Sequence, residues 1–186
     1  MVYIATMVAV SIVLKLVSNT LSQTLPTFLK ISLAYLGWYI SAAVLGPYIG
    51  CAVACISDLT GQWLIPTGGA PNPVLLVSNG LNAMIFGLIF KYVKFNKLPR
   101  YADFIIRAVI GALAASLVCT FGLSTFGLWI YYYSDSNYFA FLLTRLPQIT
   151  AVAVNILLFA GLLPVLDNLG LLPGKKERSE PRQEQN

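Results

Sequence analysis

The sequence predicts an all-α integral membrane protein, a compact bundle of six transmembrane helices with both termini in the cytoplasm. Three observations lead to this fold class. Of the 186 residues, 58% are hydrophobic and only 10% are charged, whereas a soluble domain carries about 25% charged residues. Apolar runs close to the length of a membrane span, about 20 residues, alternate with short polar loops. Basic residues cluster at Lys91–Arg100 and after Pro173, and such clusters mark the cytoplasmic side.

Six apolar runs account for the predicted spans. They cover residues 2–17, 28–45, 49–65, 73–92 and 102–121, and the sixth follows Arg145. Two spans separate the basic loop from the basic tail and four precede the loop, which places the amino terminus inside as well. We therefore expect one six-helix membrane domain over residues 1–172 and a disordered, charged cytoplasmic tail over residues 173–186.

The first run reads as a retained span, since it has no basic region before it and no clear cleavage signal. Ala5 and Ala9 lie four residues apart on one helix face, which lets another helix approach closely. This face either packs inside the protein or docks on a partner. Lys15, near the far end, can extend its ammonium group to the membrane interface.

The third run ends in a polar stripe and a loop rich in proline and glycine. Cys51, Cys55, Asp58 and Gln62 are spaced by 4, 3 and 4 residues and share one helix face. A carboxylate inside a span marks a functional site by default, so Asp58 is a candidate ligand group; the alternative is a structural hydrogen bond to a neighbouring helix. The loop after it, residues 65–72, forms the rim of the predicted pocket.

Several polar residues fall on other spans at the same predicted depth. Ser78, Asn79 and Asn82 follow the start of the fourth run at Pro73, within reach of Asp58 on an adjacent helix. Arg145 opens the sixth run, where it either extends to the interface or binds an anionic group. The predicted binding residues are Trp38, Asp58, Trp63, Asn72, Asn79, Arg145 and Asn155.

The fifth run and the segment after it carry three further signals. Asp103 and Arg107 are four apart and are expected to pair near the cytoplasmic end. Small residues (Gly111, Ala112, Ala115 and Ser116) predict a close helix contact. The aromatic segment 121–142 is expected to be irregular and to lie at the outer interface.

Composition excludes several functions. The chain has no histidine, which removes Ser-His hydrolysis and imidazole proton relays. No glycine-rich phosphate loop of the P-loop kind is present, and the three cysteines give no disulfide framework. We expect no enzymatic activity, no cofactor, no metal and no nucleic-acid partner. The two classes that remain are a membrane protein that binds a small molecule and a membrane scaffold or assembly subunit.

The stretch from Leu36 to Phe90 resembles the substrate-binding S components of energy-coupling factor (ECF) transporters, most closely the folate-type group. The resemblance rests on the Gly-Pro turn at Gly46–Pro47, on Asp58 followed by the Pro-Thr-Gly-Gly loop at Pro66–Gly69, and on the Arg-Leu-Pro-Gln sequence from Arg145. The first span adds an Ala-x-x-x-Ala pattern at Ala5 and Ala9.

The resemblance implies a subunit in the bacterial plasma membrane that captures a vitamin-like heterocycle, folate-like in kind, at the outer face. It also implies delivery inward by toppling in the bilayer, with a coupling transmembrane subunit and two ATPases as partners. Ala5 and Ala9 are then the docking patch. The chain departs from the folate type after the Gly-Gly turn, where Asn72-Pro73-Val74 stands in place of an aromatic motif, so Trp38 or Trp63 would have to stack on the ligand. Aligned polar groups such as Asp58 and Asn155 favour this function over the scaffold.

Overall fold

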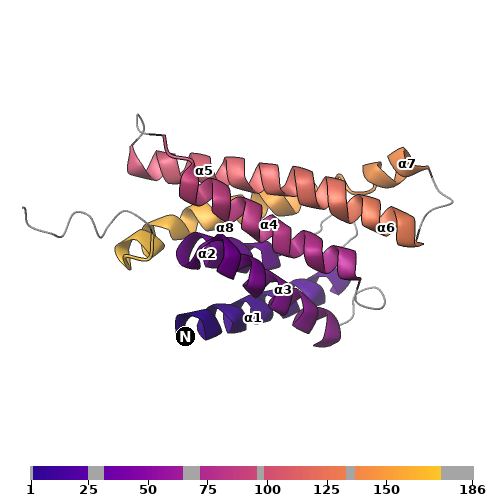
Figure 1. The fold of residues 1–186 in the computed structure, drawn as a ribbon, viewed down its shortest axis with the longest axis horizontal. Coiled ribbons are helices and arrows are strands. Elements are labelled where there is room, and N and C mark those ends of the chain that lie inside the picture. The colour runs from indigo at the N-terminus through magenta and orange to yellow at the C-terminus, as the bar shows by residue number, and fades with distance from the viewer. Residues whose placement is uncertain (1, 25–31, 65–71, 96–98, 133–136, 173–186) are drawn as a thin grey trace, which may run out of the picture.

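The computed structural model describes residues 2–24, 32–64, 72–95, 99–132 and 137–172, and the regular secondary structure of these residues is entirely helical (Figure 1). The predicted all-α fold class is therefore confirmed. The elements are α1 (Val2–Thr24), α2 (Ala34–Leu45), α3 (Pro47–Leu64), α4 (Pro73–Tyr92), α5 (Arg100–Ala115), the π-helix η1 (Ser116–Ser124), α6 (Thr125–Tyr132), α7 (Tyr138–Leu143) and α8 (Gln148–Asn168). The predicted tail at 173–186 lies outside the described residues.

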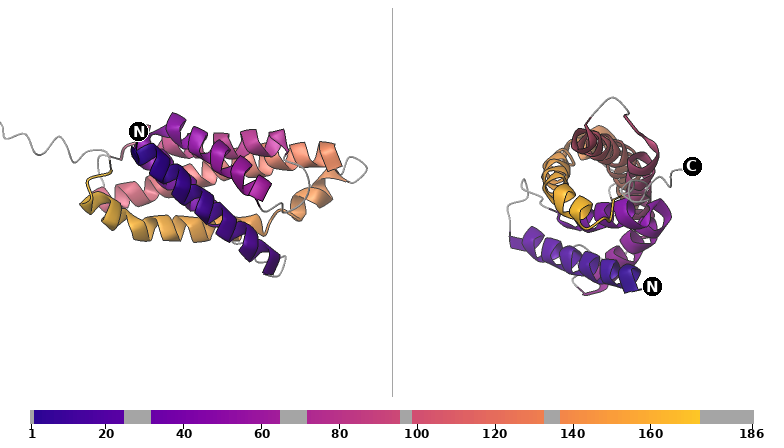
Figure 2. Two further views of the ribbon diagram at one scale, coloured as in Figure 1. Left: turned by 90° about the horizontal axis from the view of Figure 1, so that it is seen from below. Right: turned by 90° about the vertical axis from the view of Figure 1, so that its left-hand side faces the viewer.

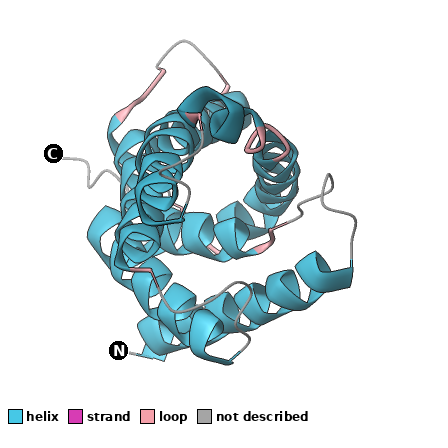
Figure 3. Cartoon of the chain, turned by 90° about the vertical axis from the view of Figure 1, so that its right-hand side faces the viewer, coloured by secondary structure: helices cyan, strands magenta, loops and turns pink. Residues whose placement is uncertain are grey.

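Four helices form a closed ring. α4 packs on α2 and α5, and α8 packs on the other sides of α2 and α5; the end-on views show these helices around a common axis (Figures 2 and 3). α3 packs outside this four-helix ring against α2 and α4, and α1 packs on α3 and α2. The interior of the ring and the junction of α1, α2 and α3 are thus two separate regions.

Four stretches in the described part of the chain are long and apolar enough to cross a membrane: Val2–Leu21, Pro73–Tyr92, Arg100–Tyr131 and Tyr138–Asn168. α2 is apolar but shorter, with 12 residues. α3 has 18 residues and lies outside this set; it carries Asp58 and Gln62, which lower its hydropathy. The start of α1 and the end of α8 lie toward the same side of the bundle (left in Figure 1), the arrangement that an even number of spans requires.

The segment from Ser116 to Tyr132 is helical, so the prediction of an irregular segment after Phe121 is wrong there. The chain continues from α5 through the π-helix η1 into α6 without a break. The Thr125 hydroxyl donates to the Thr120 carbonyl at 2.8 Å. The Ser78 hydroxyl of α4 donates to the Cys119 carbonyl at 2.7 Å. These side-chain bonds help to satisfy carbonyls in the wider turns of a π-helix.

Ion pairs and a hydrogen bond join the ends of α4, α5 and α8 at the side predicted to be cytoplasmic. Arg107 pairs with Asp103, as the spacing predicted. Asp103 also accepts a hydrogen bond from the Phe95 backbone N–H at 3.0 Å, which ties the end of α4 to α5. Arg100 Nη2 lies 2.6 Å from Asp167 Oδ1 and joins α5 to α8.

Glycine allows α2 and α3 to touch. A Cβ added at Gly50 would lie 2.6 Å from Ala42 Cα and 2.9 Å from Ala42 N, so the two backbones would have to separate. The turn between the helices is closed by Gly46, whose φ of 98° is unfavourable for other residues.

We expect Gly50→Ala to destabilise the protein by about 1–3 kcal/mol, because overpacking against a backbone cannot be relieved by a side-chain rotation. The melting temperature of the purified protein measures this. Gly161→Ala is the control, since a Cβ there meets no atom within 4 Å. Equal melting temperatures for the two variants would contradict the close packing of α2 on α3.

Candidate functional site

Aromatic side chains fill the middle of the four-helix ring. The aromatic floor, as we call it, consists of Tyr39, Phe86, Phe90, Phe104 and Phe159, all at most 3% exposed. The Tyr39 and Phe86 rings stack with centroids 4.1 Å apart, and Phe159 meets Phe86 edge-on at 5.4 Å. Apolar helices with large inward side chains produce such a core, and it closes the interior of the ring at this level.

A polar layer lies one helical turn from the floor, toward the ends at which α2, α4 and α8 begin. Asn82 precedes Phe86 by four residues and Asn155 precedes Phe159 by four, so each amide stands over an aromatic residue on the same helix face. The hydroxyls of Tyr39 and Ser116 approach each other from α2 and η1. We call these four groups the polar layer; α2, α4, α8 and η1, which continues α5, each contribute one.

The polar layer has spare hydrogen-bonding capacity. Among the described residues, the Asn82 nitrogen and oxygen and the Asn155 Oδ1 form no hydrogen bond. Asn82 and Asn155 are both 0% exposed. A buried polar group left unpaired costs about 1–3 kcal/mol. Such groups, gathered over an aromatic surface, are what a site for a flat polar heterocycle provides.

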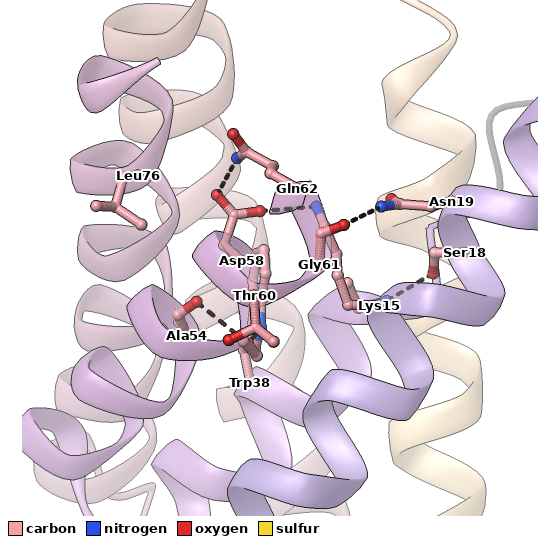
Figure 4. A network of polar contacts seen from close by, with 12 residues as sticks. Lys15, Ser18, Asn19, Trp38, Ala54, Asp58, Thr60, Gly61, Gln62 and Leu76 are labelled. Carbon is pink, nitrogen blue, oxygen red and sulfur yellow. Dashed lines mark hydrogen bonds and ion pairs between the residues drawn. The ribbon is translucent and has the colours of Figure 1, made fainter. Parts of the chain in front are cut away.

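A second polar group lies outside the ring, where α1, α2 and α3 meet (Figure 4). Asp58 is 0% exposed; its Oδ1 lies 2.7 Å from Lys15 Nζ, and its Oδ2 accepts from Gln62 Nε2 at 2.6 Å. The Lys15 ammonium also lies 5.7 Å from the centre of the Trp38 indole. We call Lys15, Asp58 and Gln62 the charge cluster. It binds helices to one another and uses both oxygens of the predicted ligand group.

Lys15 is the residue that the sequence interpretation missed. It was expected to extend to the membrane interface, whereas the structure turns it inward to Asp58. Gly61 makes room for it, since a Cβ there would lie 2.4 Å from Lys15 Cγ. The signal in the sequence was a lone lysine and a lone aspartate, each near the end of a span and of opposite charge.

The two predicted tryptophans, Trp38 and Trp63, lie in different surroundings. Trp38 is 1% exposed and its Nε1 donates to the Ser57 hydroxyl at 2.8 Å, which places it in the core beside the charge cluster. Trp63 is 76% exposed at the end of α3. The structure does not bring the two together.

The predicted asparagines also differ in their surroundings. Asn72 caps α4: its side-chain oxygen accepts from the Val74 backbone N–H at 2.9 Å, an N-cap bond. Asn155 donates to the Ser32 carbonyl at 2.6 Å and so ties α8 to the segment before α2. Asn79 is half-buried. Of the three, only Asn155 belongs to the polar layer.

Arg145 lies in the turn between α7 and α8, with its guanidinium 5.0 Å from the centre of the Phe141 ring. It is half-buried.

On α1, Ala5 and Ala9 are exposed, so they do not serve internal packing in the isolated chain. Cys51 and Cys55 face α4, where both thiols approach Gly80, and thus belong to a different contact from Asp58.

One comparison with known proteins bears on this arrangement. A family model described as ECF-type riboflavin transporter, S component, matches residues 1–168. No curated protein matches the chain. The match covers every helix described above, and it gives no support to the folate-type group as the nearest relatives.

Proposed function

The chain belongs to the ECF-type riboflavin transporter S component family, and we propose that it captures riboflavin, or a flavin of the same shape, for import. As an S component it is a multi-pass membrane protein and a substrate-binding subunit rather than an enzyme. The finer proposal places it in the bacterial plasma membrane, with the polar layer opening to the outer face. A coupling transmembrane subunit and two ATPases would supply the energy.

The unpaired amide of Asn82 carries this proposal. A carboxamide offers one donor and one acceptor side by side, which matches the alternating carbonyl and N–H groups on the pyrimidine edge of a flavin. The aromatic floor beneath it supports a flat ring, and contacts between aromatic rings contribute roughly 0.5–1.5 kcal/mol beyond area burial. Asn155 Oδ1, which can only accept, offers a partner for a ribityl hydroxyl, and the Ser116 hydroxyl can donate to a flavin carbonyl.

Binding requires the four-helix ring to widen, because Asn82 and Asn155 are fully buried. The wall best suited to yield is η1, since π-helical segments occur at functional sites and hinges. An apolar groove of about 570 Å³ lies along this wall, lined by residues of α4, η1, α6 and α7. Side chains of η1 that line the groove, such as Val118, therefore have open space beside them.

Titration of the purified protein with riboflavin tests the proposal, with quenching of flavin fluorescence as the readout. We expect saturable binding at one site, for which folate competes weakly. Binding of folate but not of riboflavin would assign a folate-like substrate instead. Binding of neither would overturn the flavin assignment and would point to a different small molecule as the substrate of this S component.

Arg145 separates the two kinds of substrate. Riboflavin carries no charge, so Arg145→Ala should change its Kd by no more than about threefold. A ligand with a carboxylate buried against Arg145 would lose on the order of 2–5 kcal/mol of binding free energy. The melting temperature of the same sample shows whether the loss is structural. A large loss of riboflavin affinity at unchanged stability would place Arg145 in the flavin site.

Docking on the coupling subunit is proposed for the exposed face of α1 that carries Ala5 and Ala9. Ala9→Leu adds bulk where small residues allow close helix contact. We expect uptake by cells to fall at least tenfold, while riboflavin binding by the isolated chain is unchanged. Val10→Leu is the control, because Val10 is also exposed but lies about 100° around the helix from Ala9. Equal loss of uptake and binding in Ala9→Leu would assign this alanine to internal packing.

A further inference from the structure

We propose that Lys15 is a positioning residue for the ligand site: it fixes Trp38, and through Trp38 it fixes the two tyrosines that α2 presents to the four-helix ring. The inference rests on the proposed function for the role of the polar layer. The contacts themselves run from α1, outside the ring, to the aromatic floor inside it.

The first step from Lys15 to the ring is made by the contacts that hold the Trp38 indole in place. Lys15 Nζ is held 2.7 Å from Asp58 and lies within the 6 Å range of a cation–π contact with the indole. The indole N–H is bound to Ser57, the neighbour of Asp58 on α3. Trp38 is thus fixed by α1 on one side and by α3 on another.

The second step leads from Trp38 into the ring. The Trp38 indole meets the Tyr35 ring edge-on, with centroids 5.0 Å apart. Tyr35 in turn lies 6.1 Å from Tyr39, which stacks on Phe86 of α4. The Tyr35 side chain lies beside Thr120 of η1, and the Tyr39 hydroxyl belongs to the polar layer. A shift of the indole would therefore move both tyrosines.

Stability alone does not explain an ion pair at this place. Two well-packed apolar side chains often hold buried helices together as well as, or better than, a buried charge pair does. The charge pair differs from apolar packing because it restricts geometry. The Lys15 ammonium must stay close to the Asp58 carboxylate and to the Trp38 indole at the same time. α1 packs mainly on α2 and α3, so a change in its position reaches the ring through these contacts.

The test uses a variant without charges, Lys15→Met/Asp58→Leu, so that no buried charge is left unpaired. Its Kd for riboflavin should rise about tenfold, a size that coupling through packed networks reaches. Asn19→Ala is the matched control: it removes another bond between α1 and α3, from Asn19 Nδ2 to the Gly61 carbonyl at 3.1 Å, and should change the Kd by less than about twofold. Lys15→Arg, which keeps the charge, should bind nearly as the parent does. Equal Kd values for the double variant and the parent would overturn the inference.

A second readout needs no ligand, so failure of the proposed function would not hide the result. In a Trp63→Phe/Trp129→Phe background, Trp38 is the one remaining tryptophan. Acrylamide should quench its fluorescence more strongly once Lys15→Met/Asp58→Leu is added, but not when Asn19→Ala is added. Unchanged quenching in the double variant would show that Lys15 does not hold the indole. If the parent binds no riboflavin and quenching still rises, the positioning stands and the flavin assignment falls.

Discussion

Replacing Asn82 with leucine should make the protein more stable and remove most of its affinity for riboflavin. Both atoms of the amide are buried without a hydrogen bond among the described residues, so a leucine of similar size removes a penalty of about 1–3 kcal/mol. The same change leaves two polar groups of the bound flavin unpaired. We expect a loss of roughly 2–4 kcal/mol of binding free energy, or about 30- to 1,000-fold in Kd.

Asn79→Leu is the matched control for this prediction. Asn79 lies three residues away on the same helix but is half-buried, so neither effect should approach that at Asn82. Thermal unfolding and riboflavin titration are measured on the same samples. A lower melting temperature with unchanged affinity would mean that Asn82 has a structural partner and stands outside the site.

Lys15→Met alone should destabilise the protein strongly, and more than Gly50→Ala does. It leaves the Asp58 carboxylate fully buried without its cation, and breaking a buried pair in this way costs about 3–5 kcal/mol. The double variant Lys15→Met/Asp58→Leu should recover most of that loss, since it leaves no buried charge behind. Chemical or thermal unfolding in detergent measures both.

The pair between Arg100 and Asp167 provides the comparison. Arg100 Nη2 lies 2.6 Å from Asp167 Oδ1, about as close as Lys15 lies to Asp58. The Arg100 side chain, however, is 37% exposed. Asp167 is 8% exposed, but a pair with one partner open to water costs less to break than a fully buried pair, so Arg100→Met should have a smaller effect than Lys15→Met. Similar losses for Lys15→Met and Arg100→Met would show that burial of Asp58 does not control the stability.

The helical fold followed from the sequence because it depends on local patterns. Apolar runs, the Gly46–Pro47 turn and the spacing of Asp103 and Arg107 each act within one helix or between neighbours in the chain, and the structure confirms these. η1 and α6 are the exception. Glycines and aromatic residues there suggested a break, yet hydrogen bonds from Thr125 and from Ser78 of another helix support continued helix.

The site followed less well because it depends on how deeply each side chain is buried between the helices. Asn79 and Asn82 precede Phe86 by seven and four residues, so both lie near its face of α4, but Asn82 is fully buried whereas Asn79 is half-buried. Asp58 was predicted to lie inside the protein, either as a ligand group or as a structural partner of a neighbouring helix, and the structure shows a contact of the second kind. Its partner Lys15 lies 43 residues earlier, and no local pattern shows that α1 crosses α3 there.

The position of α1 outside the four-helix ring has a consequence for biogenesis. A chain is made from its amino terminus, so α1 enters the bilayer before α3 exists, and Lys15 enters it without a carboxylate. A lysine at mid-membrane costs about 2.5–3.5 kcal/mol on insertion scales, but Lys15 lies six residues before the end of the span Val2–Leu21, and a long side chain can extend its ammonium toward the interface. We therefore expect Lys15 to move inward only when α3 brings Asp58, which would make docking of α1 a late step of assembly.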